Sequence, residues 1–263
     1  MKIFLFSGGL GNQIFQVYEF IINNEKYTHY STLLFNKRAL KFLRKFYFPN
    51  NHFKKLNFVF AKALFILTKF KFLNINSDVP YLQSNTVSKS KISFTNGYFQ
   101  KSFNNSELEI LKDILKQFSI IDNPSCYPEN NILIHIRRAD YIEIGEDLKL
   151  EYYIDAINYF KNEITHPKFF ILTNDKSWVE NNILPIVEYK YIDLGDARLV
   201  LNEMIKFKNI ILSNSTLSYW GYMLNMNKDK TATVPNPWFR NRNLPLYLED
   251  LKTGKQIKNQ LYS

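Results

Sequence analysis

The sequence predicts an α/β fold with parallel sheets, organised as two lobes. From Asn131 onward, apolar runs of strand length alternate with segments of helical periodicity, the pattern of a parallel, doubly wound sheet. The N-terminus shows the same succession once, because residues 2–5, which have the pattern of a strand, precede a glycine-rich loop and an apolar helix. Between these regions, the stretch IIDNPSCYPEN has the composition of a linker. We therefore predict an N-terminal lobe at residues 1–125 and a C-terminal lobe at residues 126–263.

The expected elements of the C-terminal lobe are short strands that alternate with helices. Runs rich in Ile, Leu, Val and Phe predict the strands, and apolar residues at helical spacing predict the helices. The predicted strands are residues 131–137, 168–174, 189–194, 209–214 and 231–235, and the predicted helices are residues 151–164, 177–183, 197–207 and 216–225. In the N-terminal lobe, a second helix is expected at residues 106–118.

Composition and hydropathy indicate a globular, cytoplasmic protein that is soluble or peripheral to a membrane. Hydrophobic residues make up 46% of the chain and charged residues 22%, which is typical of a folded protein. The single cysteine, Cys126, allows no internal disulfide and suits a reducing compartment. The apolar core of MKIFLFSGG is too short for a signal peptide. The longest apolar stretch, residues 56–68, contains Lys62 and is far shorter than a bilayer span.

Positive charge is concentrated in one part of the N-terminal lobe. Residues 26–77, here called the basic segment, contain no Asp or Glu, and their lysines and arginines alternate with Phe, Tyr and Leu. This pattern fits the solvated face of a helical region. It also fits a patch on an anionic membrane surface, with aromatic residues at the interface. Nucleic-acid binding is disfavoured because no recognition motif accompanies the charge.

The motif HIRRADY stands at the carboxyl end of the first strand of the C-terminal lobe. Ligands of parallel sheets lie beyond the carboxyl ends of the strands. Strand alternation points His135 and Arg137 to the same side, and Arg138 and Asp140 follow in the loop. Guanidinium groups make paired hydrogen bonds to phosphate oxygens, so Arg137 and Arg138 are candidates for binding a diphosphate. The alternative is a surface arginine pair with Asp140 as its ion-pair partner.

A second polar cluster, SNSTLSYWGYML, opens a helix after another strand. Its small polar residues surround backbone N–H groups that favour an anion. The candidates for anion binding are Asn214, Ser215, Thr216 and Ser218. The alternative is that these residues only cap the helix. In the later VPNPWF stretch, Trp238 is either a core residue or a stacking platform.

The glycine loop of the N-terminal lobe is a third candidate site, with Gly9, Gly11, Asn12 and Gln13 as its polar and conformational features. It lacks the P-loop pattern and the third glycine of a dinucleotide-binding motif. The sequence contains no D-x-D, and its four histidines are scattered, so we predict no metal site. A diphosphate would then be neutralised by arginine and a helix terminus.

Taken in order, GGLGNQIFQ, HIRRADY and SNSTLSYWGYML resemble the bacterial α-1,2-fucosyltransferases of glycosyltransferase family 11. GYFQK, EYYIDAI, FFILTNDKSWV and PNPWF match further blocks of the family, so the resemblance spans residues 1 to 240. The resemblance implies a GT-B-like fold of two Rossmann-type lobes, with the donor site in the C-terminal lobe. It also implies inverting, metal-independent transfer of L-fucose, without a cofactor, from GDP-β-L-fucose to the 2-hydroxyl of a galactose. The acceptor would be a galactose-terminated oligosaccharide or lipid-linked glycan, as in O-antigen synthesis.

The resemblance also implies roles for the candidate residues. Arg137 and Arg138 would contact the GDP diphosphate with His135 near the nucleotide, and Ser215 and Thr216 would contact the β-phosphate. From the other lobe, Asn12 and Gln13 would hydrogen-bond to sugar hydroxyls. The sequence departs from the family where Ala139 replaces a glycine and where Leu217 and Tyr219 replace aromatic residues of an SFSWW motif. These departures bear on the sugar pockets and leave the phosphate-binding groups intact.

Inverting transfer requires a base for the acceptor hydroxyl and stabilisation of the charge that grows on the leaving diphosphate. Asp140 is the nearest acidic candidate for the base, and a structural Asp140 bonded to an arginine is the alternative. Glu19, Glu143 and Asp175 are further candidates. Two other classes of function stay open, namely a glycosyltransferase that uses another nucleoside diphosphate sugar and a non-catalytic protein that binds glycans or membranes.

Overall fold

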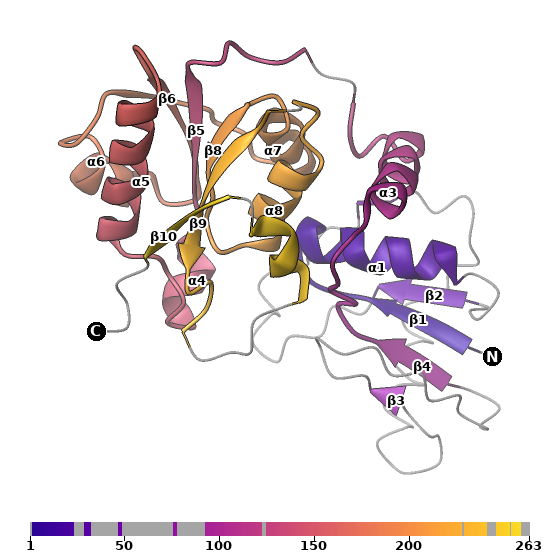
Figure 1. Cartoon of the computed structure of the whole chain (residues 1–263). Coiled ribbons are helices and arrows are strands. Elements are labelled where there is room, and N and C mark those ends of the chain that lie inside the picture. Colours follow the sequence, from indigo (N-terminus) through magenta and orange to yellow (C-terminus); the bar gives the residue numbers. More distant parts are fainter. Residues whose placement is uncertain are drawn as a thin grey trace. The chain divides into compact units, whose positions relative to one another are not determined.

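The computed structural model divides the chain into two compact units (Figure 1). Unit 1 comprises residues 1–120 and 245–247, and unit 2 comprises residues 121–244 and 248–263. The boundary follows Ile120, whereas the sequence predicted it after residue 125. The residues that the structure describes are 2–23, 29–32, 47–48, 76–77, 93–122, 125–227, 229–240, 246–252 and 254–258.

Unit 1 contains a parallel sheet with the strand order β2-β1-β4-β3 among the described residues. The expected first strand and second helix are confirmed, but the other three strands were not predicted. Strands β2, β3 and β4 are short, and β4 is the polar run SFTN, so none of them carries an apolar signal. The elements are β1 (Lys2–Phe6), α1 (Leu10–Ile22), β2 (His29–Thr32), β3 (Asn76–Ser77), β4 (Ser93–Asn96) and α3 (Asn105–Gln117).

Aromatic packing joins β1 to α1 in unit 1. Phe4 is fully buried, and its ring lies 5.3 Å from that of Phe20 in an edge-to-face arrangement. The Phe99 ring lies 5.2 Å from Phe4 on the segment that follows β4. Such pairs add directional contacts to the burial of apolar area. The loops after β1 and β4 therefore start from a shared, well-packed base.

Unit 2 contains a wholly parallel sheet with the strand order β10-β9-β8-β5-β6-β7. Every strand and helix predicted for this lobe is present, which confirms the α/β class with parallel sheets; β10 and α4 were not predicted. The strands are β5 (Asn131–Ile136), β6 (Lys168–Thr173), β7 (Tyr189–Tyr191), β8 (Asn209–Ile211), β9 (Thr231–Asn236) and β10 (Lys255–Lys258). The helices are α4 (Ala139–Glu143), α5 (Leu150–Glu163), α6 (Lys176–Asn182), α7 (Ala197–Met204) and α8 (Thr216–Met223), followed by the 3-10 helix η3 (Leu246–Leu251).

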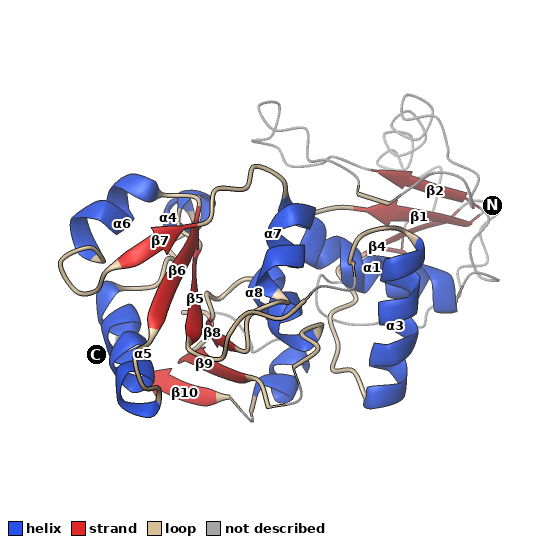
Figure 2. Ribbon diagram, turned by 90° about the horizontal axis from the view of Figure 1, so that it is seen from above, coloured by secondary structure: helices blue, strands red, loops and turns tan. Residues whose placement is uncertain are grey.

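Helices cover both faces of the unit 2 sheet, with α5 and α6 on one face and α7 and α8 on the other (Figures 1 and 2). The central strand β5 is buried along its whole length, which explains its continuous apolar run. Tyr152, Tyr153 and Phe160 of α5 pack into the core against it. Trp238 is 1% exposed, so it is a core residue and not a stacking platform.

Most of the basic segment lies outside the described residues. Its three interpretations, as a solvated face, a membrane-surface patch or a nucleic-acid contact, therefore remain predictions. Within the described part of the chain, no helix has the length and apolar character needed to cross a bilayer.

Candidate functional site

The candidate site lies at the carboxyl ends of β5 and β8 in unit 2. From β5 the chain builds the sheet in one direction through β6 and β7, and it then returns to add β8, β9 and β10 on the other side. The gap between the carboxyl ends of β5 and β8 is thus the topological switch point, where doubly wound sheets bind ligands. HIRRADY follows β5 and SNSTLSYWGYML follows β8, so the structure brings the two predicted clusters together.

His135 joins these two strands from within the wall of the site. Its Nδ1 lies 2.7 Å from Ser218 Oγ and 3.1 Å from Ser213 Oγ. The side chain is 5% exposed, and burial, reinforced by the charge of Arg137, lowers the pKa of His135 to about 3. The imidazole is therefore neutral near pH 7. These contacts give His135 a role in fixing the turn before α8, while a direct contact with the nucleotide remains a prediction.

Most of the polar side chains before α8 are used within the protein. Ser215 is the N-cap, and its Oγ accepts from Ser218 N at 3.2 Å. Ser218 Oγ accepts from Ser213 N at 3.0 Å. Asn214 is 1% exposed and donates from Nδ2 to the Glu146 carbonyl at 2.7 Å. The groups left for an anion are the Thr216 hydroxyl and the first N–H groups of α8, which have no acceptor inside the helix.

Arg137 forms a bidentate ion pair with Asp140 at the start of α4. Its Nε and Nη2 each donate at 2.9 Å, to Asp140 Oδ1 and Oδ2 respectively. The two side chains are 34% and 39% exposed. The structure therefore shows the alternative, an arginine–Asp140 pair. Because the pair is partly hydrated, it contributes little free energy and can exchange for another anion at low cost.

Arg138 has a different environment, which argues against its predicted contact with the diphosphate. Its Nη1 donates to Asp147 Oδ2 at 3.0 Å, and its Nε donates to Asp175 Oδ2 at 3.3 Å. The guanidinium also lies over the Trp178 ring, 4.3 Å from its centroid, and the side chain is only 12% exposed. In the structure Arg138 joins the loops after β5 and β6, and its contact with the diphosphate stays a prediction. The same contact occupies Asp175, a candidate base.

Glu146 is a polar residue of this edge that the sequence did not single out. It is 5% exposed, and its Oε2 accepts from Arg240 N at 2.8 Å. Since its backbone carbonyl also binds Asn214, Glu146 connects the loops that follow β5, β8 and β9. No local signal marks it, because an acidic residue in a loop is normally exposed. The candidate base Glu143 is exposed on α4.

The glycine loop of unit 1 owes its shape chiefly to Gly8. Gly8 has φ +80°, and a Cβ there would come within 2.8 Å of Asn12 Nδ2 and 3.2 Å of Tyr98 Cε1. Gly9 is the N-cap of α1 with φ −78°, and its carbonyl accepts from Asn12 N and Gln13 N, both at 3.0 Å. Gly11 is buried within α1. The strict requirement for glycine therefore falls on Gly8.

The amides of this loop bind protein groups. Gln13 is 3% exposed, donates to the Gly8 carbonyl at 3.0 Å and accepts from Tyr47 N at 3.2 Å. These contacts use both ends of its amide, so they argue against the predicted bond to a sugar hydroxyl. Asn12 Oδ1 accepts from Gln100 Nε2 at 3.0 Å, and the Asn12 side chain is partly exposed. A sugar contact of Asn12 remains a prediction.

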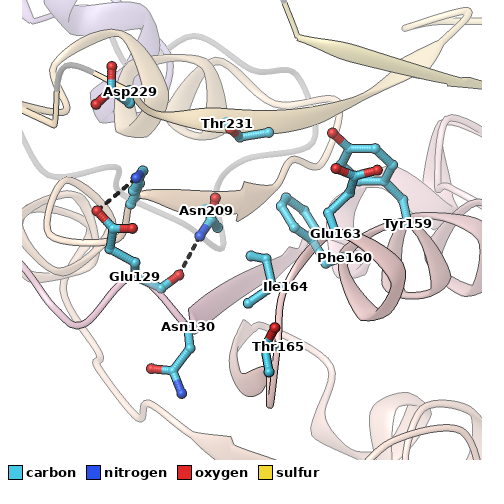
Figure 3. Close-up of a pocket in the computed structure, with 11 residues that line it drawn as sticks. Glu129, Asn130, Tyr159, Phe160, Glu163, Ile164, Thr165, Asn209, Asp229 and Thr231 are labelled. Carbon is cyan, nitrogen blue, oxygen red and sulfur yellow. Dashed lines mark hydrogen bonds and ion pairs between the residues drawn. The ribbon is translucent and has the colours of Figure 1, made fainter.

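A cavity of about 460 Å³ lies at the opposite edge of the unit 2 sheet. Figure 3 shows Asn209, at the start of β8, with its amide donating to the Glu129 carbonyl at 2.6 Å. Glu163 and Thr231 line the same hollow. Because parallel sheets bind ligands at their carboxyl edge, this cavity is not our candidate active site.

These features define an α/β protein whose unit 2 offers an arginine and a helix N-terminus at the switch point of a parallel sheet. The model of glycosyl transferase family 11 matches residues 6–243, so the chain belongs to this family. This finding confirms the family resemblance predicted from the motifs.

The chain is 29% identical over 144 residues to the Escherichia coli O-antigen biosynthesis glycosyltransferase WbnK, covering 51% of this chain and 48% of WbnK. It is 32% identical over 126 residues to an Escherichia coli alpha-1,2-colitosyltransferase, covering 44% and 43%. The chain thus matches about half the length of these relatives. A solved glycosyl transferase family 9 protein from Veillonella parvula aligns with a TM-score of 0.46 and 9% identity over 98% of this chain and 86% of that one. A likeness at this level carries no functional argument.

Proposed function

We propose that the protein transfers L-fucose from GDP-β-L-fucose, with inversion and without a metal, to the 2-hydroxyl of a galactose in a surface glycan such as O-antigen. Family membership supports glycosyl transfer. The names of the two relatives support an α-1,2 linkage and O-antigen synthesis. The observation that carries the proposal is that Arg137 and the N-terminus of α8 follow two neighbouring strands, β5 and β8, at one switch point.

In this proposal the leaving diphosphate binds where the N–H groups of α8 and the Arg137 guanidinium converge. Negative charge grows on that diphosphate as the fucose–phosphate bond breaks, so groups already aimed at it stabilise the transition state. The phosphate displaces Asp140 from Arg137. Asp140 then becomes available to accept the proton of the acceptor hydroxyl, which gives this carboxylate a second use as the general base.

A second candidate function differs only in the donor sugar. One relative is a colitosyltransferase, which favours testing the corresponding colitose donor beside GDP-fucose. The phosphate-binding groups would serve either donor, whereas the pocket around the sugar would decide between them. The acceptor would be a free or lipid-linked, galactose-terminated glycan in the cytoplasm.

The experiment is a transfer assay in which GDP-fucose, the colitose donor and UDP-sugars are each combined with a panel of β-galactosides. We expect a fucosylated product from GDP-fucose, detected by mass spectrometry, and no product from a galactoside that lacks the 2-hydroxyl. Transfer from the colitose donor alone would favour the second candidate. Binding of GDP without turnover of any donor would contradict both and favour a non-catalytic protein.

A further inference from the structure

A third arginine stands at the carboxyl edge of unit 2, four residues beyond the end of β9. The backbone N–H of Arg240 donates to Glu146 Oε2 at 2.8 Å. Glu146 is in turn bound through its carbonyl to Asn214, in the turn before α8. Arg240 is therefore fixed at the junction of the loops that follow β5, β8 and β9.

Arg137, Arg138 and Arg240 differ in their partners. Arg137 is paired with Asp140, and Arg138 is paired with Asp147 and Asp175. The Arg240 guanidinium, by contrast, has no carboxylate partner among the residues that the structure describes, although the Arg240 backbone N–H is bound to the Glu146 carboxylate. Its Nε is buried and makes no hydrogen bond there. A buried guanidinium nitrogen without an acceptor is costly, and in native proteins such a group calls for a partner.

On one side, the Arg240 guanidinium faces a residue that has no side chain. Its Nη1 lies 3.9 Å from where a Cβ on residue 145 would stand. That residue is Gly145, with φ +69°, so a side chain there would be strained and would also contact the guanidinium. Glycine thus leaves the arginine against bare backbone on this side.

A second unmatched group lies in the same junction. Asn214 Oδ1 is buried and has no hydrogen-bond partner within the described chain, although its Nδ2 is bound to Glu146. The junction therefore holds one unmatched donor, on Arg240, and one unmatched acceptor, on Asn214. Anionic oxygens match the first and a hydroxyl matches the second, and a sugar diphosphate carries both.

From these observations we propose that Arg240 binds the diphosphate of the nucleoside diphosphate sugar, an inference that rests on the proposed function. A planar guanidinium makes paired hydrogen bonds to phosphate oxygens, and an arginine without a competing carboxylate can do so without breaking an ion pair. Arg240 can thus bind the phosphate without first breaking an ion pair, whereas Arg137 must first release Asp140. Arg138 keeps its structural role.

The test compares the binding of GDP, GMP and inorganic pyrophosphate by isothermal titration calorimetry. Arg240→Gln should weaken GDP and pyrophosphate binding by about 10- to 100-fold, the usual range for a hydrogen bond to a charged group, and GMP binding by less. Arg240→Lys should recover only part of the loss, because an ammonium lacks the paired geometry. Lys168→Gln, which removes one exposed positive charge at the amino end of β6, should change none of these affinities.

Thermal unfolding without ligand separates a binding role from a structural one. Removal of an unmatched buried group should leave the unfolding temperature of Arg240→Gln equal to or above that of the wild type. An unaltered preference for GDP over GMP in Arg240→Gln, or a lower unfolding temperature with no change in binding, would overturn the inference. If the wild type binds pyrophosphate through Arg240 but shows no preference for GDP over UDP, the role of Arg240 in phosphate binding is supported and GDP-fucose as the donor is contradicted.

Discussion

The carboxyl edges of the two parallel sheets have the same design but different chemistry. In each, a central strand ends in a tight loop that leads toward a helix, and a buried polar side chain ties that loop to the neighbouring strand. In unit 1 the tie is Gln16, which donates to the Gly97 carbonyl at 2.7 Å and accepts from Ser7 N at 3.1 Å. In unit 2 it is His135, bound to Ser213 and Ser218. The fold thus fixes where each edge lies, and the side chains fix what it can bind.

The difference in charge between the two edges suggests a division of roles. The unit 1 loop presents amides that mostly bind one another or the backbone. The unit 2 edge presents arginines, acids and hydroxyls, and the ion pair of Arg137 is partly exposed to solvent. A charged phosphate needs compensation of the second kind, whereas uncharged sugar hydroxyls match amides. We therefore assign the donor diphosphate to unit 2 and keep a sugar contact for Asn12 as a prediction for unit 1.

The largest effect should come from Arg137→Ala. Loss of a charge aimed at the leaving diphosphate should lower kcat by about 100- to 1000-fold, the usual cost of removing one such group. Steady-state transfer from GDP-fucose measures this, with circular dichroism as a check of folding. Arg137→Lys should also fail badly, because an ammonium cannot make the paired contact.

The matched control for this prediction is Lys168→Ala, which removes a positive charge from the far edge of the same sheet and should keep wild-type activity. More than about a tenth of wild-type kcat in a folded Arg137→Ala protein would be too much for a preorganised charge. That result would contradict the role of Arg137 in phosphate binding and the assignment of the diphosphate to the unit 2 edge.

Gln16→Leu tests the tie in unit 1. Because Gln16 is fully buried, the change would leave the Gly97 carbonyl and Ser7 N–H without their partner. We expect a loss of roughly 2–4 kcal/mol in the free energy of unfolding, from two unsatisfied backbone groups. Denaturant unfolding provides the measurement. Gln117→Leu, at an exposed position on α3, is the control, and equal stability of the two variants would show that Gln16 is not a tie.

The two units also differ in how much of them could be predicted from sequence. In unit 2, strands such as β5 and β6 are short, nearly continuous apolar runs, and helices such as α5 have a clear apolar face. Periodicity is a local signal, so these elements were found. Strand β10 is the polar run KQIK and lies at the edge of its sheet. Strand β4, SFTN, is similarly polar. These strands carry no comparable signal.

For the site, sequence located the motifs but not the pairing of their charges. Two consequences of the fold are that Arg138 binds Asp175, 37 residues away, and that no carboxylate is paired with the Arg240 guanidinium among the described residues. Neighbouring arginines therefore looked equivalent in the sequence although their environments differ. Glycine was likewise recognised in the loop, but the position with positive φ, Gly8, was not the one chosen as a site residue.

A smaller effect should distinguish His135 from Gln16: the stability linked to His135 should depend on pH, because an imidazole titrates and an amide does not. The pKa of His135 is lowered to about 3 in the folded protein, from an ordinary value near 6.5. The unfolded chain therefore binds the extra proton first as pH falls. The stability linked to His135 is fully present above about pH 6.5 and decreases by about 1.4 kcal/mol per pH unit below it.

Denaturant unfolding of the whole protein between pH 7.5 and 5 should show this decrease in the free energy of unfolding. His135→Asn should be less stable at pH 7.5 but should lose that part of the slope, whereas His166→Gln, at an exposed histidine, should keep it. An identical pH dependence for the wild type and His135→Asn would mean that the buried imidazole does not couple folding to protons in this range.

The smallest effect is expected from the removal of divalent metal ions by a chelator, which should leave the transfer activity unchanged. Three carboxylates at the unit 2 edge are already engaged by arginine side chains, since Arg137 binds Asp140, and Arg138 binds Asp147 and Asp175. No group of three or more His, Cys, Asp or Glu suited to a metal occurs in the described part of the chain. Each of these three carboxylates would have to leave an arginine before it could bind a divalent ion, so the arginines and α8 are the better partners for the diphosphate. Transfer should proceed equally with EDTA and with EDTA that has been saturated with Mg²⁺. Loss of activity in EDTA alone, restored by Mg²⁺ or Mn²⁺, would mean that a cation and not Arg137 compensates the leaving group, and the charge assigned to the unit 2 edge would have to be revised.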